Sequence, residues 1–143
     1  MTQKITGISL FLRYAWPCAE DRLSRGLITR QEFDRLQFYI KSNTPPPVTF
    51  LLRCFPGAFN GLITFARKNG KDPWDVKTVQ EFWRYHHGHK GLCEVRLLTV
   101  MGIKGNRIQT GIKFPVINMY GLDLEPGNLI FIHRLVAVEK LEI

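Results

Sequence analysis

The hydrophobic pattern changes its period near Gly91, and this change divides the chain into two parts. Before that point, apolar residues recur at intervals of three and four, which is the spacing of one face of a helix. After it, apolar and polar residues alternate in short runs between Gly, Pro and Asn, a pattern typical of strands joined by tight turns. The pattern predicts an α+β protein with a helical domain over residues 1–90 and a small β-domain over residues 91–143.

Capping and helix-breaking residues predict where the helices begin and end. The first helix is expected to start near Thr6 and to end or kink at Pro17, which lacks a backbone N–H. Thr29 and Glu32 have the spacing of a capping box, in which each side chain accepts a hydrogen bond from the other residue's backbone. The most apolar stretch, residues 48–68, is broken at Pro56 and is therefore expected to form a hairpin of two helices.

Five short strands are predicted in the β-domain, over residues 95–100, 107–112, 116–120, 129–133 and 135–141. Pro126 and Gly127 lie in the clearest turn signal of the chain, and we expect them to form a tight turn between consecutive antiparallel strands, with a positive φ at Gly127. An open sheet would leave unpaired edges. We therefore expect the five strands to close into a small β-barrel of the OB or SH3 type.

The closing residues carry a resemblance to a known family. The run LEPGNLIFIH at residues 124–133, followed by VAVEKL at residues 136–141, resembles the closing strands of the HypC/HupF hydrogenase-assembly chaperones. The resemblance covers at most the last third of the chain and implies a small barrel of that shape. Those chaperones open with an essential cysteine in a Cys-x-x-Pro-Gly-type motif. Here Cys93 is internal and is followed by Glu94, so the resemblance supports the barrel shape better than the chaperone activity.

The charge balance points to anionic partners. Twenty Lys and Arg against twelve Asp and Glu give a net charge of +8, so the surface field favours nucleic acid, acidic proteins or phosphorylated ligands. The cations are scattered along the chain and form no basic stripe interleaved with aromatic residues. An RNA-binding surface would use four cations of the β-domain to contact phosphates, namely Arg96, Lys104, Arg107 and Lys113.

The cysteines and the N-terminal residues favour a cytoplasmic location. Cys18, Cys54 and Cys93 cannot all pair within one chain, and none belongs to a CxxC pair, which suits a reducing compartment. The N-terminus lacks the basic region, apolar run and cleavage site of a secretory signal. No stretch approaches the roughly 18 apolar residues that a membrane span needs. We therefore expect no membrane association.

Polar residues with ligand chemistry gather where the two parts join. Imidazole and thiolate are good ligands for zinc, copper or nickel, so His86, His89 and Cys93 could hold a transition metal if the chain doubles back. In the alternative interpretation, the histidines end a helix, because cations complement the negative end of its dipole. His87 lies in the same run, and His133 is a further candidate from the β-domain.

A second polar and aromatic group surrounds the expected kink at Pro17. It consists of Arg13, Tyr14, Trp16 and Cys18. An arginine beside aromatic rings can bind a carboxylate or phosphate while stacking on a ring. The alternative is a buried kink whose arginine extends its charged end to solvent.

The sequence favours binding over catalysis. It contains no phosphate-binding P-loop, no Gly-x-Ser-x-Gly elbow and no paired-carboxylate motif. The favoured interpretation is a non-enzymatic factor that needs no cofactor and binds another protein during assembly or regulation, through the barrel and the His-rich junction. Two alternatives stay open: an RNA-binding module with a basic surface, and a metal-dependent enzyme or metal carrier with its site at the junction.

Overall fold

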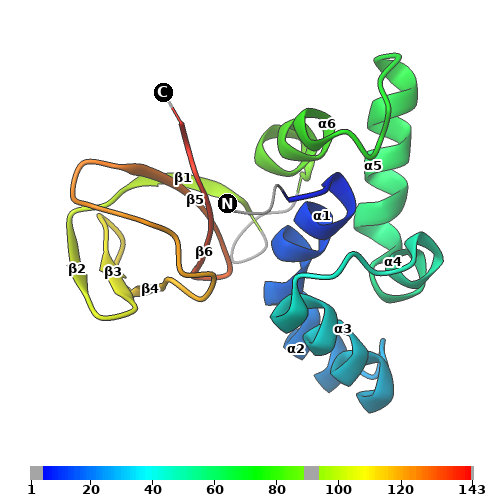
Figure 1. Cartoon of the computed structure of the whole chain (residues 1–143), viewed down its shortest axis with the longest axis horizontal. Coiled ribbons are helices and arrows are strands. Elements are labelled where there is room, and N and C mark those ends of the chain that lie inside the picture. Colours follow the sequence, from blue (N-terminus) through cyan, green and yellow to red (C-terminus); the bar gives the residue numbers. More distant parts are fainter. Residues whose placement is uncertain (1–4, 89–93, 143) are drawn as a thin grey trace. The chain divides into compact units, whose positions relative to one another are not determined.

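The computed structural model describes residues 5–88 and 94–142 and contains two compact units, one helical and one built on a sheet (Figure 1). The helical unit is Met1–His87 and the sheet unit is Gly88–Ile143. The α+β class predicted from the hydrophobic pattern is confirmed. The domain boundary expected between residues 90 and 91 falls outside the described residues. None of the helices in the described ranges is long and apolar enough to span a membrane.

Local side-chain caps start two of the helices where the sequence places them. The Thr6 hydroxyl accepts the backbone N–H of Ser9 at 3.1 Å and begins the first helix. Thr29 and Glu32 form both hydrogen bonds of the capping box, at 3.1 and 2.8 Å. The pKa of Glu32 is lowered, first because its carboxylate accepts the backbone N–H of Thr29. The helical elements of the described chain are α1 (Gly7–Ala15), the 3-10 helix η1 (Trp16–Cys18), α2 (Ala19–Ser24), α3 (Arg30–Ser42), α4 (Val48–Cys54), α5 (Pro56–Lys68), α6 (Val76–Glu81) and the π-helix η2 (Phe82–His86).

An aromatic cluster forms the centre of the helical unit. Phe11 is fully buried, and its ring lies edge-on to Trp83 at 5.3 Å and to Trp74 at 5.8 Å between ring centroids. Tyr14, one turn further along α1, stacks on Trp83 with only 11° between the ring planes. Aromatic pairs of this kind contribute about 0.5–1.5 kcal/mol each beyond the area that they bury. The cluster therefore fixes α1 against η2 and the segment before α6.

The sheet unit contains six strands in the order β1-β5-β6-β4-β3-β2. Neighbouring strands pair antiparallel except β4 and β6, which are parallel and meet at one residue pair, Ile117 and Val136. One core cluster of the unit consists of Val100, Ile108, Val116, Ile130, Ile132 and Ala137. The strands are β1 (Arg96–Thr99), β2 (Gly102–Lys104), β3 (Arg107–Gln109), β4 (Val116–Ile117), β5 (Leu129–His133) and β6 (Val136–Lys140).

The expected barrel is wrong, because the sheet is open and its edges are β1 and β2. These two strands follow each other in the chain and are separated only by Val100 and Met101. The amide of Val100 donates to the carbonyl of Asn128 at 2.8 Å, whereas the amide of Met101 donates to the carbonyl of Gln109 at 2.8 Å. Consecutive residues thus bond to different neighbours. The chain passes from the β5 side to the β3 side instead of pairing β1 with β2.

The turn prediction at Pro126 and Gly127 is confirmed in part. Gly127 has φ +96°, and the amide of Asn128 donates to the carbonyl of Glu125 at 3.1 Å, so this segment is a tight turn that needs glycine. The turn does not join consecutive antiparallel strands, because β4 and β5 are not neighbours in the sheet. The chain between the first two predicted strands contains a further strand. Gly102–Lys104 is itself a strand, and the chain reverses at Gly105, whose φ is +62°.

Candidate functional site

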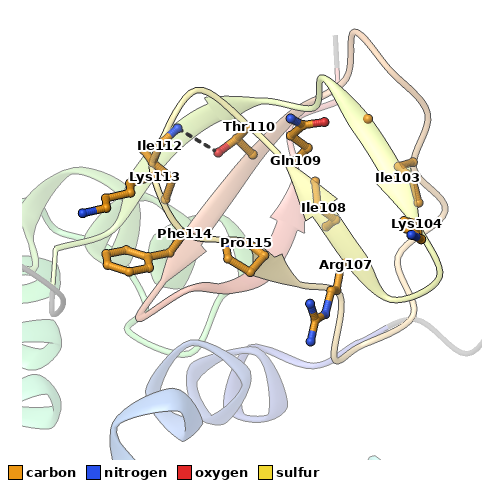
Figure 2. A pocket seen from close by; sticks show the side chains of 11 residues that line it. Ile103, Lys104, Arg107, Ile108, Gln109, Thr110, Ile112, Lys113, Phe114 and Pro115 are labelled. Carbon is orange, nitrogen blue, oxygen red and sulfur yellow. Dashed lines mark hydrogen bonds between the residues drawn. The ribbon is translucent and has the colours of Figure 1, made fainter.

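A pocket of about 470 Å³ lies in the sheet unit between the β2–β3 hairpin and residues 110–115 (Figure 2). Three of the four cations that the sequence assigns to phosphate contacts line it, namely Lys104, Arg107 and Lys113. Its apolar lining is Ile103, Ile108, Ile112, Phe114 and Pro115, and its uncharged polar lining is Gln109 and Thr110, with Gly102. Within the described residues, the lining includes no Asp or Glu.

The β2–β3 hairpin places two of these cations directly opposite each other. Lys104 and Arg107 are cross-strand partners in the antiparallel register, on either side of the turn at Gly105. Like charges directly opposite each other in a sheet are destabilising. Among the described residues, neither side chain forms an ion pair with a carboxylate. The hairpin therefore holds two exposed positive charges close together, and an anion bound between them would relieve their repulsion.

The opposite wall supplies the third cation and an aromatic ring. In this wall the Thr110 hydroxyl accepts the backbone N–H of Ile112 at 3.3 Å, which bends the chain before Lys113. The Phe114 side chain is 56% exposed, and the Lys113 ammonium lies 5.8 Å from the centroid of its ring. Figure 2 shows Lys113 and Phe114 on one side of the pocket and Lys104 on the other, with Arg107 between them in this view. The pocket thus combines positive charge with a flat apolar surface.

Arg96 does not line this pocket. It belongs to β1, whereas Lys104 and Arg107 belong to β2 and β3 at the other end of the strand order. The four cations predicted as one phosphate-binding set are therefore not all brought together. The pocket lined by Lys104, Arg107 and Lys113 is called the basic pocket.

The histidines before the boundary pack on aromatic rings. His86 stacks on Phe65 with ring centroids 4.6 Å apart, and His87 lies 4.3 Å from Trp83. His89 and Cys93 lie outside the described residues, so the metal set of His86, His89 and Cys93 stays a prediction. Across residues 5–88 and 94–142, no three His, Cys, Asp or Glu side chains are grouped so that they could hold a metal ion.

The remaining candidates lie largely inside the protein. Tyr14 is fully buried, and its hydroxyl accepts a hydrogen bond from the Arg84 Nε at 3.2 Å. Trp16 is 8% exposed, and its ring lies 5.0 Å from the ring of Phe33. Arg13 is half-buried in the last turn of α1, and His133 is fully buried at the end of β5. A binding role for these four residues stays a prediction.

Sequence reasoning missed Phe114 as a site residue. The available signal was the sequence Lys113-Phe114-Pro115, in which an aromatic side chain follows a cation in a segment too short and too polar to be a core strand. Neither this signal nor the spacing of Lys104 and Arg107 shows that the β2–β3 hairpin and residues 110–115 line one pocket, because that depends on the strand pairing.

No family model matches the chain, and no curated protein or solved structure matches it. The resemblance to the HypC/HupF chaperones therefore stays a prediction from the closing residues.

Proposed function

We propose that the sheet unit is a non-enzymatic nucleic-acid-binding module that holds the phosphates of RNA in the basic pocket. One observation carries the proposal: Lys104, Arg107 and Lys113 line a single pocket of about 470 Å³ in which the described lining has no acidic residue. Phosphates are the anions that a nucleic acid presents at every nucleotide, and contacts to them supply much of its affinity for proteins. The net charge of +8 adds a long-range attraction for the same partner.

The cross-strand pair of Lys104 and Arg107 supports this proposal on energetic grounds. Opposed like charges cost stability in the unbound hairpin, and a phosphate between them converts repulsion into two attractive contacts. Arg107 has the planar donor fork that matches phosphate oxygens, whereas Lys104 and Lys113 act as point charges on flexible stems. The three side chains therefore suit a chain of phosphates with variable spacing better than one fixed small anion.

The test is the salt dependence of binding to a fluorescent mixed-sequence RNA, measured by anisotropy. For a single strand, each lost phosphate contact lowers the slope of log affinity against log salt by about 0.7. The triple variant Lys104→Gln/Arg107→Gln/Lys113→Gln should therefore lose about 2 units of slope together with most of its affinity at low salt. A matched control, Lys41→Gln/Lys77→Gln/Arg96→Gln, removes three exposed cations outside the pocket and lowers the net charge equally.

The two variants separate pocket binding from general attraction to a basic protein. The proposal predicts a much larger loss for the pocket variant than for the control. Equal losses of RNA affinity in the two variants would mean that any three surface cations contribute as much as those of the pocket, and the proposal would be rejected. Failure of the parent protein to bind RNA even at low salt would reject it as well.

Protein binding at the sheet edges is a second candidate, favoured by exposed apolar side chains there. Leu97 on the edge strand β1 is 44% exposed, and Ile103 on the edge strand β2 is 43% exposed. Edge strands present unpaired backbone groups to which another strand can add. A second copy of the chain is the partner that can be tested directly. Sedimentation analysis should then show a concentration-dependent dimer that Leu97→Lys/Ile103→Lys abolishes. A parent protein that stays monomeric would reject self-association through the sheet edges.

A further inference from the structure

We infer that the basic pocket takes single-stranded nucleic acid and that one base stacks on the ring of Phe114. This inference rests on the proposed function and adds the class of strand and the residue that recognises it. The aliphatic core cluster of the sheet unit does not include Phe114, whose ring is left 56% exposed. A single exposed apolar residue is ordinary on a protein surface. Phe114 differs because it belongs to the wall of a pocket that also carries three cations.

The spacing of ring and charge fits a nucleotide. The Lys113 ammonium lies over the Phe114 ring, 5.8 Å from its centroid. The flexible stem of Lys113 lets the ammonium move to the phosphate of a nucleotide whose base takes its place on the ring. Arg107 and Lys104 extend from the other wall, where the next phosphate along the strand would lie (Figure 2). Aromatic stacking beside a positively charged groove is how proteins bind single strands without sequence preference.

The size and chemistry of the pocket favour one unpaired nucleotide over a duplex. A volume of about 470 Å³ lies in the range of sites that enclose small molecules. In a duplex the bases are paired and stacked on each other, so only the phosphates can reach the three cations. A duplex would therefore bind through charge alone and gain nothing from the ring. Stacking on Phe114 should contribute only when the strand is single.

The inference is tested with one oligonucleotide sequence presented as single-stranded RNA, as single-stranded DNA and as the matching duplex. Phe114→Ala should weaken binding of the single strands at least about fivefold, the low end of what one base–aromatic stack contributes. The loss should be similar at every salt concentration, because removing the ring releases no counterions. Duplex binding should change less than twofold. Phe114→Trp should bind the single strands at least as tightly as the parent, since indole presents a larger ring.

A second exposed phenylalanine provides the matched control. Phe38 of α3 is 61% exposed and lies in the helical unit, so Phe38→Ala removes a comparable ring at a position outside the pocket. It should leave all affinities unchanged. The melting temperature of Phe114→Ala should match that of the parent, which separates lost stacking from lost folding.

The outcomes distinguish this inference from the proposed function. If the triple charge variant binds as well as its control, the proposed function fails and the inference fails with it. If the charges matter but Phe114→Ala weakens single strands and duplex equally, or weakens neither, the module stands and base stacking on Phe114 is overturned. A loss confined to the single strands and restored by Phe114→Trp supports the inference.

Discussion

Gly7 allows helix α1 to approach the backbone of Trp74, and replacing it with alanine should destabilise the helical unit. A Cβ at this position would lie 1.9 Å from the carbonyl oxygen of Trp74 and 2.7 Å from its carbonyl carbon. Cβ atoms essentially never come within 3.0 Å of such neighbours, and a backbone carbonyl cannot rotate away as a side chain can. The helix or the segment before α6 therefore has to shift by about 1 Å.

The shift is costly because both partners are tied to the aromatic cluster. Phe11 of α1 contacts the rings of Trp74 and Trp83, so moving α1 disturbs contacts that are already closely packed. Overpacking a well-packed core costs about 1–3 kcal/mol, and a backbone obstacle belongs at the upper end. Alanine regains up to about 1 kcal/mol of helix propensity over glycine. The expected net loss in the free energy of unfolding is therefore about 2 kcal/mol.

Gly57 offers the matched control within the same unit. It also lies in the first turn of a helix, α5, but a Cβ there would meet nothing within 4 Å. Gly57→Ala should leave stability unchanged or raise it by up to about 1 kcal/mol. Urea unfolding followed by circular dichroism at 222 nm measures both variants against the parent. A Gly7→Ala variant as stable as Gly57→Ala would refute the argument from close approach.

Two further predictions concern a buried thiol and a turn. Burial raises the pKa of Cys54 to about 11 from an ordinary value of 9.0, so the folded state keeps this proton longer than the unfolded state does. The contribution of the protonated thiol to the free energy of unfolding is fully present below pH 9, and it declines by at most about 3 kcal/mol as the pH rises through 11. Urea unfolding of Cys54→Val should lack this contribution to the decline at high pH. Gly127→Val should cost about 1 kcal/mol or more because φ is +96°, whereas Gly111→Ala, at a position with open space and no positive φ, should leave the melting temperature unchanged.

Elements with local signals were predicted well. The start of α1 at Thr6 and the capping box of α3 depend on hydrogen bonds between residues three apart, so a few neighbouring letters specify them. The strand predicted over residues 129–133 is β5, with the same bounds. The barrel prediction failed because closure depends on which distant strands pair. The change of partner occurs at Val100 and Met101, whose amides donate to Asn128, just before β5, and to Gln109 of β3, and no local pattern predicts it.

The parts of the candidate site that depend on local signals were also predictable, and the parts that depend on strand order were not. Lys104 and Arg107 flank a Gly-Asn turn, so their pairing across a hairpin follows from turn chemistry once the turn is found. Arg96 was grouped with them because it is basic and belongs to the same domain, but the strand order separates it from the pocket. Phe114 joins the site through the fold of residues 110–115 around Thr110, which periodicity does not reveal.

The opposed cations at the β2–β3 turn connect the energetics of the fold to its proposed role. Like charges at directly paired positions destabilise a sheet, so a sequence whose features all favour one fold has opposite charges, or none, at such positions. Lys104 and Arg107 depart from that rule, and the described part of the chain supplies no carboxylate that pairs with either. Local departures of this kind are expected at functional sites, where a partner provides what the fold lacks. The missing component here is negative charge, and the phosphates of the proposed single-stranded partner would supply it in a pocket that combines three cations with an exposed ring.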